Sequence, residues 1–180
     1  MTFGEKLVVF WLLASAMASA MAFWRPRSAE GPSGMRMMPL VGAASAGIAL
    51  ALGIVGVESH TLRSHLVQVV PLVFVLIGLR RQSRWSTAAA QVVLTFWLLM
   101  MGAIWLFLLG VAQIIGGTFT SIEIALTIAI GLAAALGLSA AIRTPPPATT
   151  RLASVATTVL FGGLQAVAMW LSFQPIVTGR

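Results

Sequence analysis

Six long apolar runs make up most of the chain. They cover residues 7–24, 37–57, 65–79, 87–112, 121–142 and 152–173. An α-helix that crosses a hydrocarbon layer about 30 Å thick needs about 20 such residues, because it rises about 1.5 Å per residue. The runs lack the alternation of a barrel strand, and lipid offers no partner to an unpaired backbone amide. The pattern therefore predicts an all-α, polytopic transmembrane bundle of six membrane-spanning helices, forming a single integral membrane domain over residues 1–180.

Two of these runs depart from the ideal length. The third, 65–79, is short, so its ends are expected to reach into the interfaces. The fourth, 87–112, is long enough to tilt in the bilayer or to end early near Gly110.

Basic residues gather in alternate connections between the runs. Eight of the eleven fall after the first, third and fifth runs: Arg25, Arg27, Arg36, Arg80, Arg81, Arg84, Arg143 and Arg151. The other side holds Lys6, Arg63 and Arg180 together with Glu5, Glu58 and Glu123. By the positive-inside rule the arginine-rich loops are cytoplasmic and both termini lie outside, an N-out/C-out topology. The expected location is a membrane of the bacterial inner-membrane type.

The first run also has features of a signal peptide, with small residues at Ala18-Ser19-Ala20 after an apolar core. Its removal would leave five spans and place Arg80, Arg81 and Arg84 on the wrong face. The charge pattern therefore favours a first helix that is retained.

Composition agrees with a membrane protein. The chain is 59% hydrophobic and only 8% charged, which leaves too few polar side chains to coat a soluble globule of 180 residues. The net charge of +7 resides mostly in the short loop clusters, so it is read as topogenic rather than as a nucleic-acid surface. The expected partners are the lipid bilayer and other membrane protein subunits, with no nucleic acid. Because the chain has no cysteine, thiolate metal sites, disulfides and thiol catalysis are excluded.

Helix association inside a bilayer depends on close approach at small residues. The first, second and fifth runs carry such residues every four positions: Ala14, Ala18 and Ala22; Ala43, Gly47 and Ala51; Ala129, Ala133 and Gly137. The third and fourth runs are bulkier and are expected to face lipid or a partner subunit: Val69, Leu72, Phe74, Trp97, Leu98, Trp105 and Phe107.

The segment from Glu58 to His65 holds both histidines of the protein. Imidazole ligates metals and haem iron, and a carboxylate can complete a site, so Glu58, His60 and His65 form a candidate metal site, with His60 and His65 as candidate cofactor ligands. No cofactor is required by the sequence; haem, a metal or a pigment are the alternatives. The spacing of five residues turns the two rings about 140° apart on one helix, so a shared metal requires a folded hairpin. The competing interpretation is that the histidines lie at the interface and cap helix ends.

His65 and Gln68 share one face of the third run and make a polar stripe that enters the membrane, with Pro71 one turn further. A transporter or pigment site could use this stripe. The alternative is a hydrogen bond between helices.

Glu123 lies beside an apolar run, and one interpretation is that its carboxyl group carries protons. Thr120 and Glu123 also have the spacing of a capping box, which we favour. The methionine pairs Met100/Met101 and Met17/Met21 could be soft copper ligands, but methionine in apolar helices is usually filler.

No Asp, Glu, Lys or Arg lies near the centre of any run, and no catalytic constellation is present. The sequence therefore predicts that the protein is not an enzyme. The leading hypothesis is a non-catalytic subunit or scaffold of a larger membrane complex. The alternatives are a small transporter or channel for a neutral solute, with Gln68, Thr127 and Gln165 as sparse contacts, and a membrane protein that binds a metal, haem or pigment through the outward loop histidines.

Overall fold

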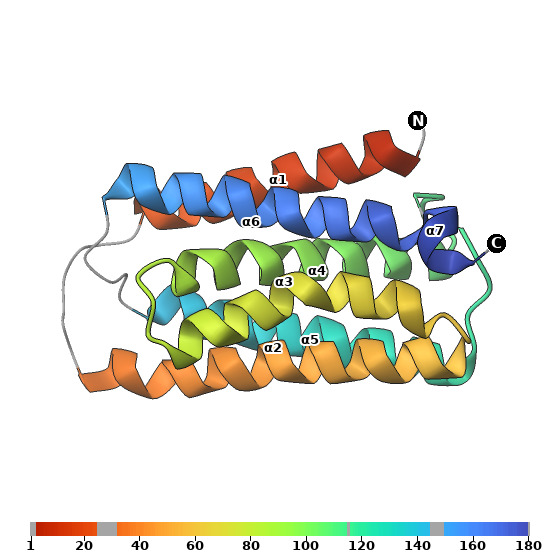
Figure 1. Ribbon diagram of the computed structural model, residues 1–180, viewed down its shortest axis with the longest axis horizontal. Helices are drawn as coiled ribbons and strands as arrows, with labels where there is room; N and C mark the ends of the chain where they lie inside the picture. Colours follow the sequence, from red (N-terminus) through yellow and green to blue (C-terminus); the bar gives the residue numbers. More distant parts are fainter. Residues whose placement is uncertain (1–2, 25–31, 115, 145–149, 180) are drawn as a thin grey trace.

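The computed structural model describes residues 3–24, 32–114, 116–144 and 150–179, with the side chains of 3, 22–24 and 32–36 left out. These residues form a bundle of long antiparallel helices (Figure 1), and the described part of the chain contains no strand. The elements in chain order are α1 Phe3–Trp24, α2 Pro32–Glu58, α3 Leu62–Arg80, α4 Ser86–Leu108, α5 Ser121–Arg143, α6 Arg151–Ser172 and the short α7 Pro175–Thr178.

The six predicted spans are confirmed as six helices long and apolar enough to cross a membrane. The third is longer than expected, at 19 residues, since α3 begins at Leu62 and continues to Arg80. The fourth ends early, near Gly110, which was one of the two alternatives. Helix α4 ends at Leu108, and Gly110 follows with a positive φ of 71°. The single turn of α7 was not predicted.

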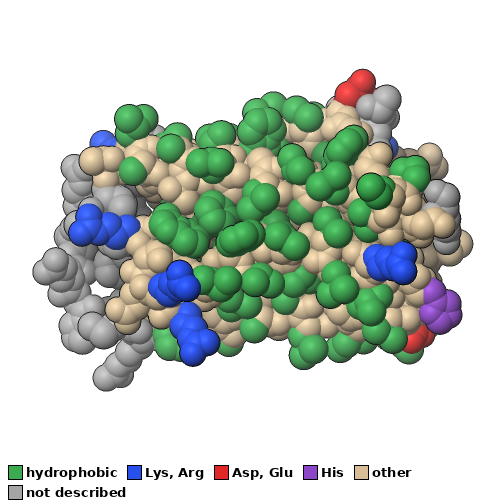
Figure 2. Space-filling view, viewed as in Figure 1, with side chains coloured by type: hydrophobic (Ala, Val, Ile, Leu, Met, Phe, Trp, Pro, Cys, Tyr) green, Lys and Arg blue, Asp and Glu red, His purple; other side chains and the backbone are tan. Residues whose placement is uncertain are grey.

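The long helices run along the bundle, so the connections between them lie at its two ends (Figure 1). The histidine end carries His60 and His65, and α1, α3 and α5 begin there; the arginine end carries Arg80, Arg81, Arg84, Arg143 and Arg151. The described chain starts and finishes at the histidine end (Figure 1). A space-filling view shows a belt of hydrophobic side chains between two ends at which the charged side chains gather (Figure 2). This is the surface of an integral membrane protein. Arg25, Arg27, Arg180 and the turn prolines Pro145–Pro147 lie outside the described residues.

Helix α4 is the centre of the bundle, which corrects the expectation that it faces lipid or a partner. It contacts all five of the other long helices, and every residue from Ser86 to Trp97 is buried. Trp97 is 1% exposed, and Leu72 of α3 is fully buried. Bulky side chains are needed here because a central helix must fill the space between its neighbours. The expectation holds for Phe74, which is 48% exposed on the outer face of α3.

Close approach at small residues is confirmed for parts of the predicted ridges. Ala14 and Ala18 are fully buried, and Gly137 of α5 lies so close to α2 that an added Cβ would be 2.6 Å from the Ala44 Cβ. The ridge proposed for α2 is wrong in register, since Ala43 and Gly47 are exposed. The inward face of α2 is instead Val41, Ala44, Ser45, Ile48, Ala51 and Leu52.

Candidate functional site

A cavity of about 320 Å³ opens at the histidine end of the bundle. All six long helices and the connection between α4 and α5 contribute to its wall. Its volume is at the lower end of the range of about 300–1,000 Å³ that is typical of small-molecule sites. The polar residues of its lining are Lys6, Ser59, Thr61, His65, Gln68, Thr118, Glu123 and Thr127.

The mouth of the cavity is polar because it is built from the first turns of α1, α3 and α5. Lys6 belongs to the first turns of α1, His65 to the start of α3 and Glu123 to the start of α5. The connection between α4 and α5 covers part of this mouth and contributes Ile114 and Phe119 to the lining. Two long-range contacts hold that connection in place: the Lys6 Nζ donates to the Ile114 carbonyl oxygen at 2.8 Å, and the rings of Phe107 and Phe119 have centroids 6.2 Å apart.

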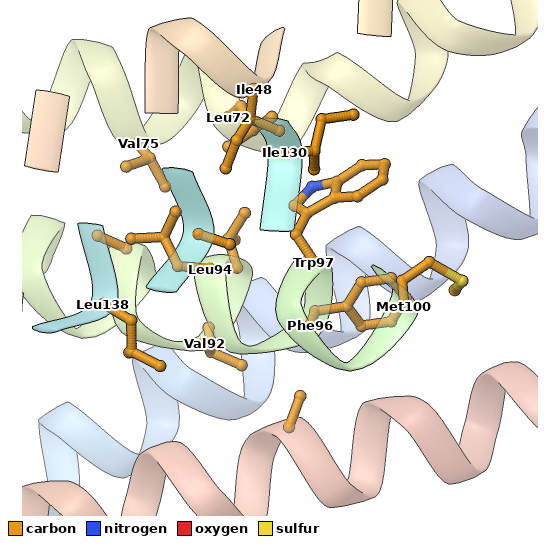
Figure 3. Packing of buried hydrophobic residues seen from close by; sticks show 14 of the residues in the cluster. Ile48, Leu72, Val75, Val92, Leu94, Phe96, Trp97, Met100, Ile130 and Leu138 are labelled. Atoms are coloured by element: carbon orange, nitrogen blue, oxygen red, sulfur yellow. The ribbon is translucent and has the colours of Figure 1, made fainter. Parts of the chain in front are cut away.

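The floor of the cavity is apolar and lies about two helical turns inside. Ile130 is seven residues beyond Glu123 on α5, and Trp97 is seven residues before Ile104 on α4, so both helices give a depth of about 10 Å. Trp97 projects from α4 toward Ile130 (Figure 3). Methionine side chains, among them Met100 and Met101, make up the rest of the floor.

Trp97 brings an unusual polar group into this core. Its indole Nε1 is buried and has no hydrogen-bond partner in the part of the chain that the structure describes. A buried donor without a partner costs about 1–3 kcal/mol, so packing of the large ring must outweigh that cost. No sequence pattern predicts this feature, because an aromatic residue in an apolar run is equally consistent with a position that faces lipid.

His65 lies in the wall of the cavity, partly buried. Its Nδ1 is 3.0 Å from the Thr61 Oγ1 and 3.1 Å from the Thr61 carbonyl oxygen. These contacts tie the ring to Thr61, the residue that precedes α3. With Nδ1 used in this way, Nε2 is the ring nitrogen left for another partner. A second hollow is lined by the turn between α2 and α3, including His60, by the start of α3 and by α7. Its lining shares four residues with the cavity, which separate the two spaces: Thr61, His65, Gln68 and Phe173.

The candidate metal set is not brought together as a cluster. Across residues 3–24, 32–114, 116–144 and 150–179, no three or more His, Asp or Glu side chains form a group that could hold a metal ion. His60 is exposed, and its positive φ of 55° places it in the turn between α2 and α3. Glu58 is exposed at the end of α2, and neither residue lines the cavity.

The polar stripe of α3 makes the contact between helices that one interpretation predicted. The Gln68 Nε2 donates to the Ser172 Oγ of α6 at 2.9 Å, and both residues are buried. Gln165 of α6 is fully buried, its Nε2 donates to the Gln68 carbonyl oxygen at 3.5 Å, and its Oε1 has no partner among the described residues. Of the three proposed solute contacts, Gln68 and Thr127 line the cavity and Gln165 does not.

The capping box at the start of α5 is confirmed. The Thr120 amide donates to the Glu123 Oε2 at 2.7 Å, and the Glu123 amide donates to the Thr120 Oγ1 at 3.2 Å. Glu123 also lines the cavity, so the same side chain caps α5 and is within reach of a solute. Four polar residues of the lining are not singled out by the sequence pattern: Lys6, Ser59, Thr61 and Thr118.

Fold and site together define a polytopic helical membrane protein with a small cavity that is polar at its mouth and apolar at its floor. No protein-family model matches the sequence, and the searches of curated proteins and of solved structures likewise gave no match.

Proposed function

We propose that the protein is a small membrane carrier that binds a solute of no net charge in the cavity at the histidine end. The observation that carries this proposal is the cavity itself, with its size, its polar mouth and its apolar floor. Clefts of this kind, with a few polar groups set in an apolar wall, are the usual form of a small-molecule site.

The charges of the lining favour a solute without net charge. Lys6 and Glu123 are the charged side chains among the described lining residues, and they have opposite signs. An ion would meet a like charge at the mouth, and among the described lining residues no acidic or basic side chain lies further in to replace its water. Thr127 and Gln68 are the polar groups nearest the floor, and they suit hydrogen bonds rather than charge.

A carrier is favoured over an open channel by the packing of α4. Its unbroken buried segment from Ser86 to Trp97 fills the bundle between the cavity floor and the arginine end. A solute would therefore pass only through a change in helix packing, such as carriers undergo. Pro39 in α2 and Pro71 in α3 each remove one helical hydrogen bond and provide points at which those helices can bend.

The subunit or scaffold role is the weaker proposal. It depended on outward faces of α3 and α4, and the burial of α4 leaves only the α3 face, with Phe74 and Leu66. Lipid is a sufficient partner for that face. A scaffold also has no need of an internal cavity.

The proposed orientation follows from charge. Five arginines with described side chains lie at the arginine end, against Lys6 and Arg63 at the histidine end. The positive-inside rule then supports a cytoplasmic arginine end, termini on the outer side and a membrane of the bacterial inner-membrane type. In this orientation the cavity opens outward, and the proposed activity is transport without catalysis.

Flux into liposomes tests the carrier proposal. The purified full-length protein is reconstituted and exposed to a panel of small solutes without net charge. Saturable uptake is expected for at least one solute. Thr127→Phe adds a ring to the cavity and should abolish this uptake. The matched control is Leu132→Phe on the lipid-facing side of the same helix, where Leu132 is 60% exposed, and it should retain the uptake. A folded protein that leaves the bilayer sealed to the whole panel would overturn the proposal.

A further inference from the structure

The mouth of the cavity presents one positive and one negative side chain from different helices. Lys6 is on α1 and Glu123 is on α5, both partly buried, and both line the same cavity. We infer that the solute is a small zwitterion that carries a carboxylate, an ammonium and one large apolar group, as a hydrophobic amino acid does. This inference rests on the proposed function and deepens it by naming the class of solute.

Lys6 has the capacity to bind the carboxylate. An ammonium group has three N–H donors, and the bond to the Ile114 carbonyl oxygen uses one of them. That bond also holds the lysine side chain at the mouth, beneath the connection between α4 and α5. The remaining donors can make charge-assisted bonds to a carboxylate, which are about twice as strong as bonds between neutral groups.

Glu123 has the capacity to bind the ammonium. Its Oε2 accepts the hydrogen bond from the Thr120 amide, so the capping box fixes the side chain before any solute arrives. Its Oε1 is then the oxygen that can accept from a solute. A carboxylate already fixed in position loses little side-chain freedom on binding, which favours affinity.

The floor provides for the apolar group. Trp97, Met100, Met101, Ile130 and Met169 surround a space about 10 Å below the charged mouth. An aromatic or branched aliphatic side chain fits a cavity of about 320 Å³ that has these walls. The methionines can adapt to different shapes, since their side chains are unbranched and flexible.

A zwitterion is the charge pattern that satisfies both mouth residues at once. An anion that binds Lys6 is repelled by Glu123, and a cation that binds Glu123 is repelled by Lys6. A molecule without formal charge leaves both residues without a charged partner in a partly buried site. Discrimination between these classes is therefore expected to come from the mouth, and affinity for the apolar group from the floor.

Equilibrium binding to the purified full-length protein in detergent tests this inference with four probes that share one phenyl group. They are phenylalanine as the zwitterion, phenylalaninamide as the cation, 3-phenylpropionate as the anion and 3-phenylpropanamide as the neutral form. Phenylalanine is expected to bind at least about ten-fold more tightly than each of the others, the size of effect that one charge-assisted hydrogen bond gives.

Two variants test which mouth residue binds the carboxylate of the solute and which binds its ammonium group. Lys6→Met should weaken phenylalanine about ten-fold and should not weaken phenylalaninamide, which lacks the carboxylate. Glu123→Gln should weaken phenylalanine and strengthen 3-phenylpropionate. Glutamine keeps the capping box, so this variant should melt at the wild-type temperature. Lys6→Arg, which retains the positive charge, is the matched control for Lys6→Met and should retain most of the affinity.

The outcomes separate the inference from the proposed function. If 3-phenylpropanamide binds as tightly as phenylalanine, or if either singly charged probe binds most tightly, the zwitterion is overturned while solute binding in the cavity stands. If none of the four probes binds and the liposome panel is also negative, both proposals fail.

Discussion

The close contact between α2 and α5 at Gly137 predicts a large effect from adding one methyl group. In Gly137→Ala the new Cβ would lie 2.6 Å from the Ala44 Cβ and 3.1 Å from the Leu94 Cδ1. Ordinary contact between such atoms begins near 3.4 Å, so α2 and α5 must separate by about 1 Å. Overpacking of this kind typically costs about 1–3 kcal/mol. For a chain of this length the melting temperature in mild detergent should fall by about 2–12 °C.

The matched control is Gly131→Ala, also on α5. Its Cβ would meet the Met101 Cβ at 3.6 Å, which is ordinary contact, so this variant should gain helix propensity and melt at or above the wild-type temperature. Adding Ala44→Gly to Gly137→Ala removes the atom that clashes and should restore most of the loss. If Gly137→Ala melts as high as Gly131→Ala, or if Ala44→Gly gives no rescue, overpacking between α2 and α5 is refuted.

Two further predictions concern the buried amides and the orientation. Gln68→Met removes the hydrogen bond to Ser172 and should lower the melting temperature by a few degrees, since bonds between helices in a membrane contribute about 0.6 kcal/mol on average and up to about 1.7. Gln165→Met removes the Oε1 that has no partner among the described residues, together with the long 3.5 Å bond from the Gln165 Nε2 to the Gln68 carbonyl oxygen. This variant should therefore lower the melting temperature less than Gln68→Met does, and the reverse order of the two variants would contradict the assignment. Because the chain has no cysteine, single-cysteine variants report orientation without background: a membrane-impermeant maleimide applied to spheroplasts should label Thr178→Cys and leave Ser83→Cys unlabelled, and the opposite pattern would invert the topology.

The architecture was predictable because lipid imposes one strong rule on the sequence. Each spanning segment must be apolar for about 20 residues and helical throughout, so counting apolar runs gives the number of helices. Helix ends were predictable where local chemistry sets them, as at the capping box of Thr120 and Glu123 and at Gly110 beyond α4.

The interior was not predictable because inward and outward faces are equally apolar in a membrane protein. Trp97 was expected to face lipid and is in the core, while Gly47 was expected at a helix contact and is exposed. In a soluble helix, polar positions would have marked the outer side. Here only the spacing of small residues was informative, and it placed Gly137 correctly but gave the wrong register for α2.

The candidate site was predictable in part. The polar stripe of His65 and Gln68 does lead to a cavity, and Thr127 lies in its wall. Lys6 was missed because its role depends on contact with Ile114, 108 positions away in the sequence. A contact at that separation leaves no local pattern in the chain.

The central claim is that the cavity at the histidine end admits a small molecule. The thiol of Thr127→Cys, in the wall below the mouth, tests it directly through its reaction with N-ethylmaleimide. We expect it to react much faster than the thiol of Ile48→Cys, a fully buried position outside the lining, and to be protected by saturating phenylalanine or by any solute that shows saturable flux. A Thr127→Cys thiol that reacts as slowly as that of Ile48→Cys would contradict the account.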